Sequence, residues 1–303
     1  MVGATAAIRT PAEARPADPE VTVLTAAGSD VRPFLSPVWV VRHLFGLRDS
    51  ILRLTRQEMA RLYAGTALGL FLAVIQGLVL MGTYVFVFSY VFEARWSYPG
   101  MEPGSGRFGL VLFAGLLTFN LFADSVARAP NLIHDNAKLV TKVVFPVEIL
   151  PIALLMRVGL VALINLGLLV PAVALVEGRL PVTLLLGVVL LASFALLALG
   201  VTYVVAAVGT FFRDAAHAVG VLLRVLMFAT PVFYSVEGLG PRLQSLLLLN
   251  PLTWAVESSR MLFAIGQTPP LWYVGALLLV GPLSAYLGLL FFMRLRKGFR
   301  DVL

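Results

Sequence analysis

Between Ala67 and Leu295 the sequence repeatedly runs for about 20 or more residues with hardly a charged side chain, the length that a helix needs to cross roughly 30 Å of hydrocarbon. These runs are too long, and alternate too little, for barrel strands, and an open sheet would leave backbone groups without partners in lipid. We therefore predict an all-α integral membrane protein. Its six transmembrane helices are expected at 67–92, 108–126, 149–176, 182–212, 215–234 and 271–293.

The composition supports a membrane protein and narrows its chemistry. Of the 303 residues, 59% are hydrophobic and 13% are charged, whereas a soluble domain has roughly a quarter charged residues. The sequence has no cysteine, so disulfides, thiolate metal sites and a cysteine nucleophile are excluded.

The basic residues predict the orientation of the chain in the membrane. The net charge is +7, but the basic residues are spread over the loops and form no single face for nucleic acid. With a cytoplasmic N-terminus, the inner segments carry Arg42, Arg48, Arg53, Arg56, Arg61, Arg128, Lys138, Lys142, Arg213, Arg294, Arg296, Lys297 and Arg300. The outer segments carry only Arg95, Arg107, Arg179, Arg242 and Arg260. This excess of inner positive charge predicts that both termini are cytoplasmic.

The chain divides into three parts. Residues 1–35 lack apolar periodicity and the features of a secretory signal, so we expect a mobile cytoplasmic tail. Residues 36–64 are predicted to form an amphipathic interface helix, which lies either in the inner headgroup plane or against a cytosolic partner. Residues 65–303 are predicted to form the six-span transmembrane domain. The apolar side of the interface helix carries Leu44, Leu47, Ile51, Leu52, Leu54, Met59, Leu62 and Tyr63.

Two connections between the spans have structure of their own. The inner segment 129–146 mixes apolar and polar residues and has Pro130 in a favourable first-turn position, which predicts a short amphipathic cytoplasmic helix. In the outer segment, 243–249 and 252–265 are each too short to cross the membrane, and Asn250-Pro251 interrupts the helical path between them. We expect two short re-entrant helices that dip into the outer leaflet.

The sequence offers no sign of chemistry within this chain. It has no Gly-x-x-x-x-Gly-Lys-Ser/Thr motif, so it should not bind and hydrolyse a nucleotide through a P-loop. His43, His134 and His217 lack the spacing of metal ligands. With no nucleophile elbow either, we predict no catalytic residue, no metal and no cofactor in this chain.

Two arginines, Arg157 and Arg224, lie within the apolar runs, where charges are usually functional or paired. Either side chain could snorkel to the inner headgroups. If both faced a shared cavity, their guanidinium groups would suit a phosphate. Asp124 and Glu148, near the cytoplasmic ends of spans, are the natural ion-pair partners.

Aromatic residues form a second constellation. On the first span Tyr84, Phe86, Phe88, Tyr90 and Phe92 alternate along the helix, so some rings face lipid as an interfacial belt and others face inward. The second and fifth spans add Phe113, Phe119, Phe122, Phe228, Phe233 and Tyr234. Since aromatic faces stack on the C–H side of sugar rings, the inward-facing rings could line a path for a glycan.

The order of these parts resembles the permease subunits of type-2 ABC exporters, in particular those that move O-antigen, capsular polysaccharide or teichoic acid. The resemblance covers about residues 36–303. Its landmarks are the basic amphipathic helix, the inner segment 131–146, Val147-Glu148-Ile149-Leu150-Pro151, Phe212-Arg213-Asp214, Thr230-Pro231-Val232-Phe233-Tyr234 and Leu249-Asn250-Pro251.

The resemblance implies a homodimer in the bacterial inner membrane that pairs with two copies of a P-loop ATPase, which binds ATP and Mg. The pair would export a lipid-linked polysaccharide. By the same resemblance, the ATPase-coupling residues are Asn131, His134, Asp135, Asn136 and Lys138, and the gate residues are Asn250, Pro251 and Trp254. The substrate path would include Tyr84, Phe88, Phe119, Phe122, Arg157, Arg224, Phe228 and Tyr234.

Three alternatives remain open at this point. A type-2 exporter of a small lipid, drug or peptide would share the architecture. An ion-coupled carrier working alone would need a midplane carboxylate and internal repeats, neither of which is found in the sequence. A membrane-embedded transferase would need an acidic or histidine cluster at one leaflet.

Overall fold

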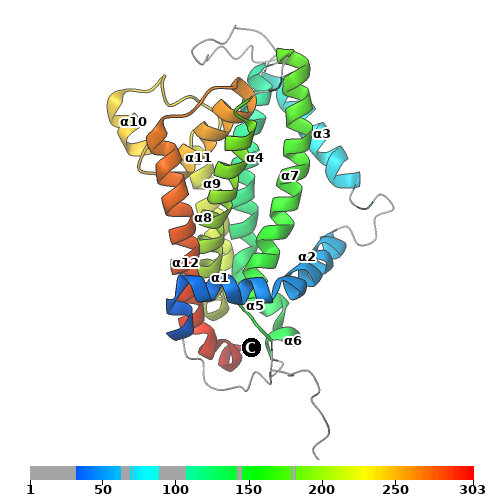
Figure 1. The fold of residues 1–303 in the computed structure, drawn as a ribbon, viewed down its shortest axis with the longest axis vertical. Coiled ribbons are helices and arrows are strands. Elements are labelled where there is room, and N and C mark those ends of the chain that lie inside the picture. The colour runs from blue at the N-terminus through cyan, green and yellow to red at the C-terminus, as the bar shows by residue number, and fades with distance from the viewer. Residues whose placement is uncertain are drawn as a thin grey trace, which may run out of the picture.

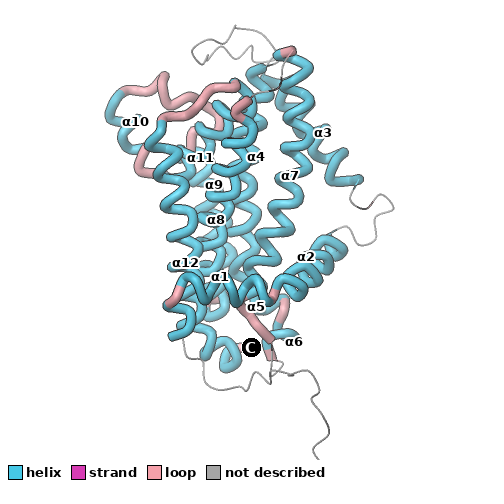
Figure 2. Tube along the Cα trace, viewed as in Figure 1, coloured by secondary structure: helices cyan, strands magenta, loops and turns pink. Residues whose placement is uncertain are grey.

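A computed structural model describes residues 32–62, 69, 71–88, 107–141, 145–178, 180 and 182–303. All regular secondary structure in these residues is helical. The long helices run side by side along the longest axis of the molecule (Figure 1). The described loops gather at the two ends of the bundle (Figure 2). This arrangement confirms the predicted all-α membrane class, because the backbone hydrogen bonds of a helix lie within the segment, as hydrocarbon requires.

Within the described residues, four helices are long and apolar enough to cross a membrane. They are α4 (Arg107–Arg128), α7 (Ile149–Glu177), α8 (Leu184–Phe211) and α12 (Leu271–Val302). They correspond to the second, third, fourth and sixth predicted spans.

The first and fifth predicted spans form shorter helices, α3 (Phe71–Phe86) and α9 (Ala215–Ala229). Their 16 and 15 residues correspond to about 24 and 22 Å at roughly 1.5 Å per residue. α9 ends where Thr230 turns to an extended conformation before Pro231, because the residue before a proline disfavours helix. The count of six spans stays a prediction.

The helix α4 forms the centre of the bundle. In the apolar 18-residue stretch of α4, 78% is buried inside the protein, against 28% in the corresponding stretch of α7. α4 therefore packs on neighbours around most of its circumference. Those neighbours include α3, α7, α8, α9, α11 (Pro251–Ser259) and the following segment η4 (Arg260–Ile265).

α8 and α12 are in close contact along their length. A Cβ at Gly200 would collide with the backbone of Ser284, and one at Gly281 would collide with the backbone of Ser193. Ser193 Oγ in turn donates to Leu277 O at 2.7 Å. Small residues of this kind let two helix backbones approach in a membrane, where packing and hydrogen bonds drive association.

At the inner end, α1 (Pro37–Gly46) and α2 (Arg48–Leu62) lie across the base of the long helices (Figure 1). The predicted amphipathic helix is therefore interrupted at Leu47. Ile51 and Leu54 are buried, and α2 packs on α7, where Thr55 Oγ1 donates to Met156 Sδ at 3.8 Å.

One residue of the predicted apolar side departs from the pattern. Leu52 is 45% exposed. It follows Ile51 directly, so its side chain is turned about 100° around the helix from the face of Ile51 and Leu54 that packs on α7. Tyr63, the last residue of that predicted side, lies outside the described residues.

At the outer end, α10 (Pro241–Leu247) and α11 (Pro251–Ser259) are separated at Asn250-Pro251, where the break was predicted. α11 continues into a π-helical segment, η4 (Arg260–Ile265), which ends at Gly266 with φ of 78°. These short helices lie at the end of the bundle opposite to α1 and α2 (Figure 1).

Candidate functional site

Two motifs of the sequence meet at the outer end of the bundle. Asn250 Oδ1 accepts from the Leu252 N–H at 3.0 Å and so caps α11. Its Nδ2 donates to Thr230 Oγ1 at 3.0 Å. Proline at the first helical position needs no N–H partner, which makes Asn-Pro a natural helix start. The predicted gate residues Asn250 and Pro251 therefore join the end of α9 to the start of α11.

A buried arginine organises the same region. Arg260 is 0% exposed, and its Nη1 donates to Tyr234 O and to Glu257 Oε1, each at 3.1 Å. Its Nη2 donates to Val232 O. A Cβ at Gly115 of α4 would lie 2.8 Å from Arg260 Nε, so glycine makes room for the guanidinium group.

Arg260 is not among the site residues predicted from the sequence, where it counted only as an outer basic residue. The sequence does contain a signal for this ion pair. Glu257 and Arg260 are three residues apart, the spacing of neighbours on a helix surface, and the residues around them are mostly apolar. Both side chains are buried, and buried charges are normally paired.

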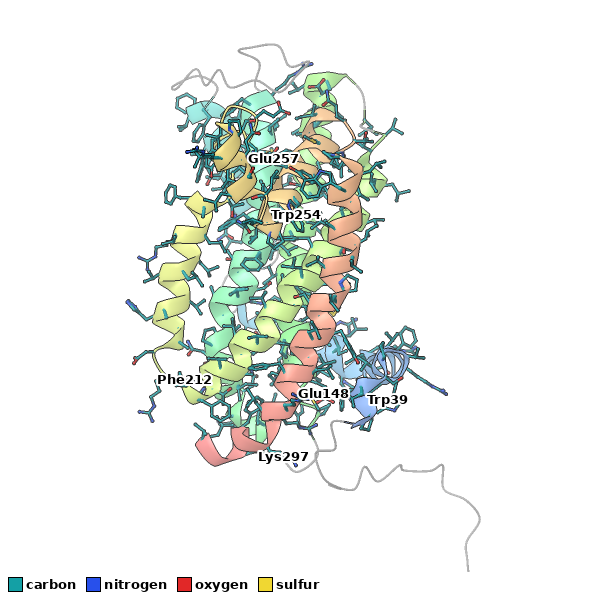
Figure 3. The ribbon with its side chains drawn as sticks, turned by 90° about the vertical axis from the view of Figure 1, so that its left-hand side faces the viewer. Trp39, Glu148, Phe212, Trp254, Glu257 and Lys297 are labelled. Carbon is teal, nitrogen blue, oxygen red and sulfur yellow. The ribbon has the colours of Figure 1, made fainter. Side chains whose placement is uncertain are left out.

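Trp254, the third predicted gate residue, fastens α11 to its neighbours. Its Nε1 donates to Leu248 O at 2.8 Å, and its ring meets that of Trp272 on α12 with centroids 5.7 Å apart. Trp254 and Glu257 lie together near the outer end (Figure 3). The outer helices, the segment 230–234 and the start of α12 thus form one connected unit, which we call the outer unit.

Four aromatic rings, of which Phe233 belongs to the outer unit, connect α3 to α9. Phe88 lies between Tyr84 at 6.3 Å and Phe233 at 6.4 Å, measured between ring centroids. Phe233 in turn lies 6.2 Å from Phe228. Tyr234 takes part through its hydroxyl, which donates to Phe228 O at 3.0 Å. Of the predicted path residues, the structure brings Tyr84, Phe88, Phe228 and Tyr234 together, with Phe233 between them.

Two other predicted path residues have a different position. Phe119 and Phe122 are 3% and 5% exposed, and Phe122 packs against Phe194 of α8 with ring centroids 6.3 Å apart. Both rings are therefore buried in the core of the bundle, and their place in the substrate path stays a prediction.

The two intramembrane arginines are also separated. Arg157 on α7 is 4% exposed, whereas Arg224 lies on the exposed surface of α9. The interpretation in which both face one cavity within the chain is therefore wrong. Arg157 and Arg128 are the cations whose charge acts on Asp124.

Glu148 connects four parts of the inner end. Its carboxylate pairs with His43 of α1 at 3.0 Å and with Arg296 of α12 at 3.6 Å, and not with Arg157 or Arg224 as hypothesised. Tyr203 of α8 donates its hydroxyl to Glu148 O at 2.7 Å. Glu148 directly precedes α7 and lies at the inner end near Trp39 and Lys297 (Figure 3). We call Glu148, His43, Tyr203 and Arg296 the inner cluster.

The predicted coupling helix is broken into three short turns. They are η3 (Ala129–Asn131), α5 (Leu132–Asp135) and α6 (Ala137–Val140). The interruption between α5 and α6 falls at Asn136, whose Nδ2 donates to Leu132 O at 3.0 Å. A side chain that hydrogen-bonds locally competes with the helical ladder, which explains the break.

The predicted coupling residues differ in exposure. Asn136 is 5% exposed, so it supports the turn from inside. Asn131, His134, Asp135 and Lys138 are exposed. The segment is anchored at its start, because a Cβ at Gly209 of α8 would collide with Pro130.

A bundle of long apolar helices, a basic amphipathic pair at one end and interrupted helices at the other define a multi-pass helical membrane protein. The chain belongs to the ABC-2 type transporter family, whose model matches residues 49–264.

Individual relatives extend this match over most of the chain. The O-antigen export system permease protein RfbA of Myxococcus xanthus is 30% identical over 234 residues, which cover 76% of this chain and 86% of that protein. Two proteins of the same name from Klebsiella pneumoniae are 23% and 26% identical over 258 and 259 residues. Each of these alignments covers 85% of this chain and 96% of the relative.

Proposed function

We propose that this chain is the permease subunit of an ATP-driven exporter of an O-antigen-like, lipid-linked polysaccharide. The observation that carries the proposal is its similarity, over 76–85% of its length, to three permeases named for O-antigen export. The absence of a P-loop motif from the sequence supports a separate ATPase. ATP and Mg would then be bound by that partner, in a complex of two permease chains and two ATPase chains.

The proposed topology has six spans and two cytoplasmic termini in the bacterial inner membrane. α3 and α9 would be the first and fifth spans, each completed by neighbouring residues. The inner surplus of Arg and Lys supports this orientation. α10 and α11 would be gate helices at the outer face.

In this proposal the exposed side chains of η3, α5 and α6 dock on the ATPase. Asn131, His134, Asp135 and Lys138 present polar groups away from the bundle, as a docking contact requires. The close contact between Pro130 and Gly209 would transmit the movement of the ATPase to α8. At the outer end, the rings of Tyr84, Phe88 and Phe228 with Tyr234 would offer weak, repeated contacts to a passing glycan.

The docking proposal is tested by Asp135→Arg, which reverses one exposed charge. Copurification of the cognate ATPase should fall by about tenfold, the effect of roughly 1.4 kcal/mol. The matched control is Asp49→Arg, the same change at an exposed site of α2, which should keep copurification at the wild-type level. Unchanged copurification in both variants would remove η3 to α6 as the docking segment.

The substrate proposal is tested in the source bacterium. Deletion of the gene should abolish surface polysaccharide and leave the lipid-linked polymer inside the cell. Normal surface polysaccharide in the deletion strain, together with loss of a labelled phospholipid or drug export activity, would favour a small-molecule exporter.

A further inference from the structure

A polar cavity lies between α3, α4 and α7, away from the outer unit and the inner cluster. Its volume is about 180 Å³, smaller than the roughly 300–1,000 Å³ of pockets for drug-sized ligands. Its polar lining consists of Gln76, Asn120, Asp124 and Asn165, and the rest of the lining is apolar or glycine. The cavity therefore has room for one ring-sized group and not for a polymer.

The cavity lies toward the inner half of the bundle. Asn120 and Asp124 are four residues apart and so share one face of α4, near its inner end at Arg128. Gln76 lies on α3, five residues from Phe71, where that helix begins. Asn165 lies near the middle of α7. Three different helices thus direct polar groups to one place.

These polar side chains differ in exposure: Gln76, Asn120 and Asp124 are exposed on the surface of the chain, and Asn165 is half-buried. Within the part of the chain that the structure describes, Asn165 Oδ1 is buried and has no hydrogen-bond partner. It lies against Gly77, where any side chain would collide with it. Buried polar atoms without partners are uncommon and costly, more so at membrane depth. Exposed carboxamide and carboxylate groups at membrane depth also lack water, and a bound group that both donates and accepts hydrogen bonds would pair with them.

The charges around the cavity select the class of that group. Arg128 and Arg157 oppose the charge of Asp124, so a cation gains little there. The lining itself contains no Lys or Arg, so the wall offers a phosphate no direct ion-pair partner. Carboxamide and carboxylate groups match neighbouring hydroxyl groups, which donate to the oxygens and accept from the amide N–H. The apolar remainder of the wall suits the C–H face of a sugar.

We propose that this cavity binds one uncharged, hydroxyl-rich sugar ring at the inner half of the membrane. The inference deepens the proposed function and rests on it. The cavity would hold a single ring of the lipid-linked substrate near the inner leaflet, apart from the aromatic rings at the outer end. Asn120, Asp124 and Asn165 would bind hydroxyl groups, and Gln76 would approach from α3.

The absence of cysteine from the chain provides a direct test. Val161→Cys places one thiol in the cavity wall, and Val189→Cys places one on the exposed surface of α8 as the matched control. The alkylation rate of each thiol is measured on the full chain in lipid nanodiscs. The probes are dodecyl β-D-glucoside, dodecyl phosphate and dodecylammonium, which share one tail and differ in headgroup charge.

The glucoside at about four times its dissociation constant should slow alkylation of Val161→Cys about fivefold and leave Val189→Cys unchanged. Adding Asn120→Leu, or Gln76→Leu on another helix if the first variant does not fold, should remove the protection. Equal protection by the phosphate or ammonium probe would overturn the proposed ligand class. Equal slowing at Val189→Cys would identify a general effect of the amphiphile and overturn the site.

The site and the proposed function fail in different ways. If deletion of the gene abolishes surface polysaccharide while the glucoside gives no protection, the cavity is not a sugar site and the exporter proposal stands. If the glucoside protects the cavity and the deletion strain exports its polysaccharide normally, the binding site stands and the exporter proposal fails.

Discussion

The two ends of the molecule are held together in different ways. In the outer unit the hydrogen-bond partners are close in sequence: Arg260 binds carbonyls 26 and 28 residues away, and Asn250 binds Thr230 20 residues away. In the inner cluster, Glu148 is joined to His43 and Tyr203, 105 and 55 residues distant, and to Arg296 near the C-terminus. The exception in the outer unit is Ser259 of α11, which donates to Ala114 O of α4. The outer unit is thus held mainly by short-range bonds, whereas the inner cluster holds separate helices together.

This difference suggests what each end can do. The local bonds within the outer unit can survive a movement that breaks only its bond to α4. Because the inner cluster joins α1, α7, α8 and α12, it transmits a movement of one helix to the other three. Under the proposed function, the outer end suits a gate, and the inner end suits the transfer of movement from the ATPase.

The largest effect is expected from Arg260→Met, which removes the donor to three acceptors, one of them the carboxylate of the buried Glu257. We expect a loss of about 3–5 kcal/mol of stability, measured by thermal unfolding of the detergent-purified chain. Combining it with Glu257→Met should restore part of the loss. A single variant as stable as the wild type would show that Arg260 does not hold the outer unit together.

A smaller effect is expected from Glu148→Gln, which keeps the shape of the side chain and removes its charge. The loss should be about 1–3 kcal/mol. Hydrogen exchange should rise in α1 and at the inner end of α12, with α10 and α11 unchanged. Tyr203→Phe, which removes only the bond to Glu148 O, is the milder control. Faster exchange at the outer end would contradict the separation of the two ends.

Asn250→Ala should cost about 1 kcal/mol, because it removes the cap of α11 and the bond to Thr230. Hydrogen exchange should rise in the first turn of α11 and leave the inner cluster unaffected. Thr230→Val removes the other partner. The two changes should be less than additive by roughly 0.5 kcal/mol or more, and strict additivity would mean that the bond contributes nothing.

The smallest effect on stability is expected at Phe228, which is 71% exposed. Phe228→Ala should change stability by no more than about 0.5 kcal/mol and yet slow the appearance of surface polysaccharide. Leu222→Ala, at a similarly exposed position of α9, is the control for general loss of apolar surface. Equal export rates in both variants would take Phe228 out of the substrate path.

The sequence predicted the fold class and most of the helix positions, because charge-poor runs and proline positions are read directly from it. It did not predict which face of a span meets protein and which meets lipid. In water a polar face marks the outside of a helix, but hydrocarbon is as apolar as a protein core. Phe119, in the core, and Phe228, on the surface, therefore looked equivalent.

The sites were predicted less well than the fold. The residues of the outer helix break were found because Asn-Pro carries its own local signal. The partners of Glu148 were not, since they come from α1, α8 and α12 and follow only from the packing of these helices. The break at Asn136 was missed as well, because the surrounding residues have the pattern of a continuous amphipathic helix.

The glycine contacts between α8 and α12 limit where the bundle can rearrange. At Gly200, Gly281 and Gly288 the two backbones touch without intervening side chains, so neither helix can slide or rotate past the other without steric collision. The two helices therefore act as one rigid unit within each chain. Any opening of the protein has to come from helices that move relative to α8 and α12.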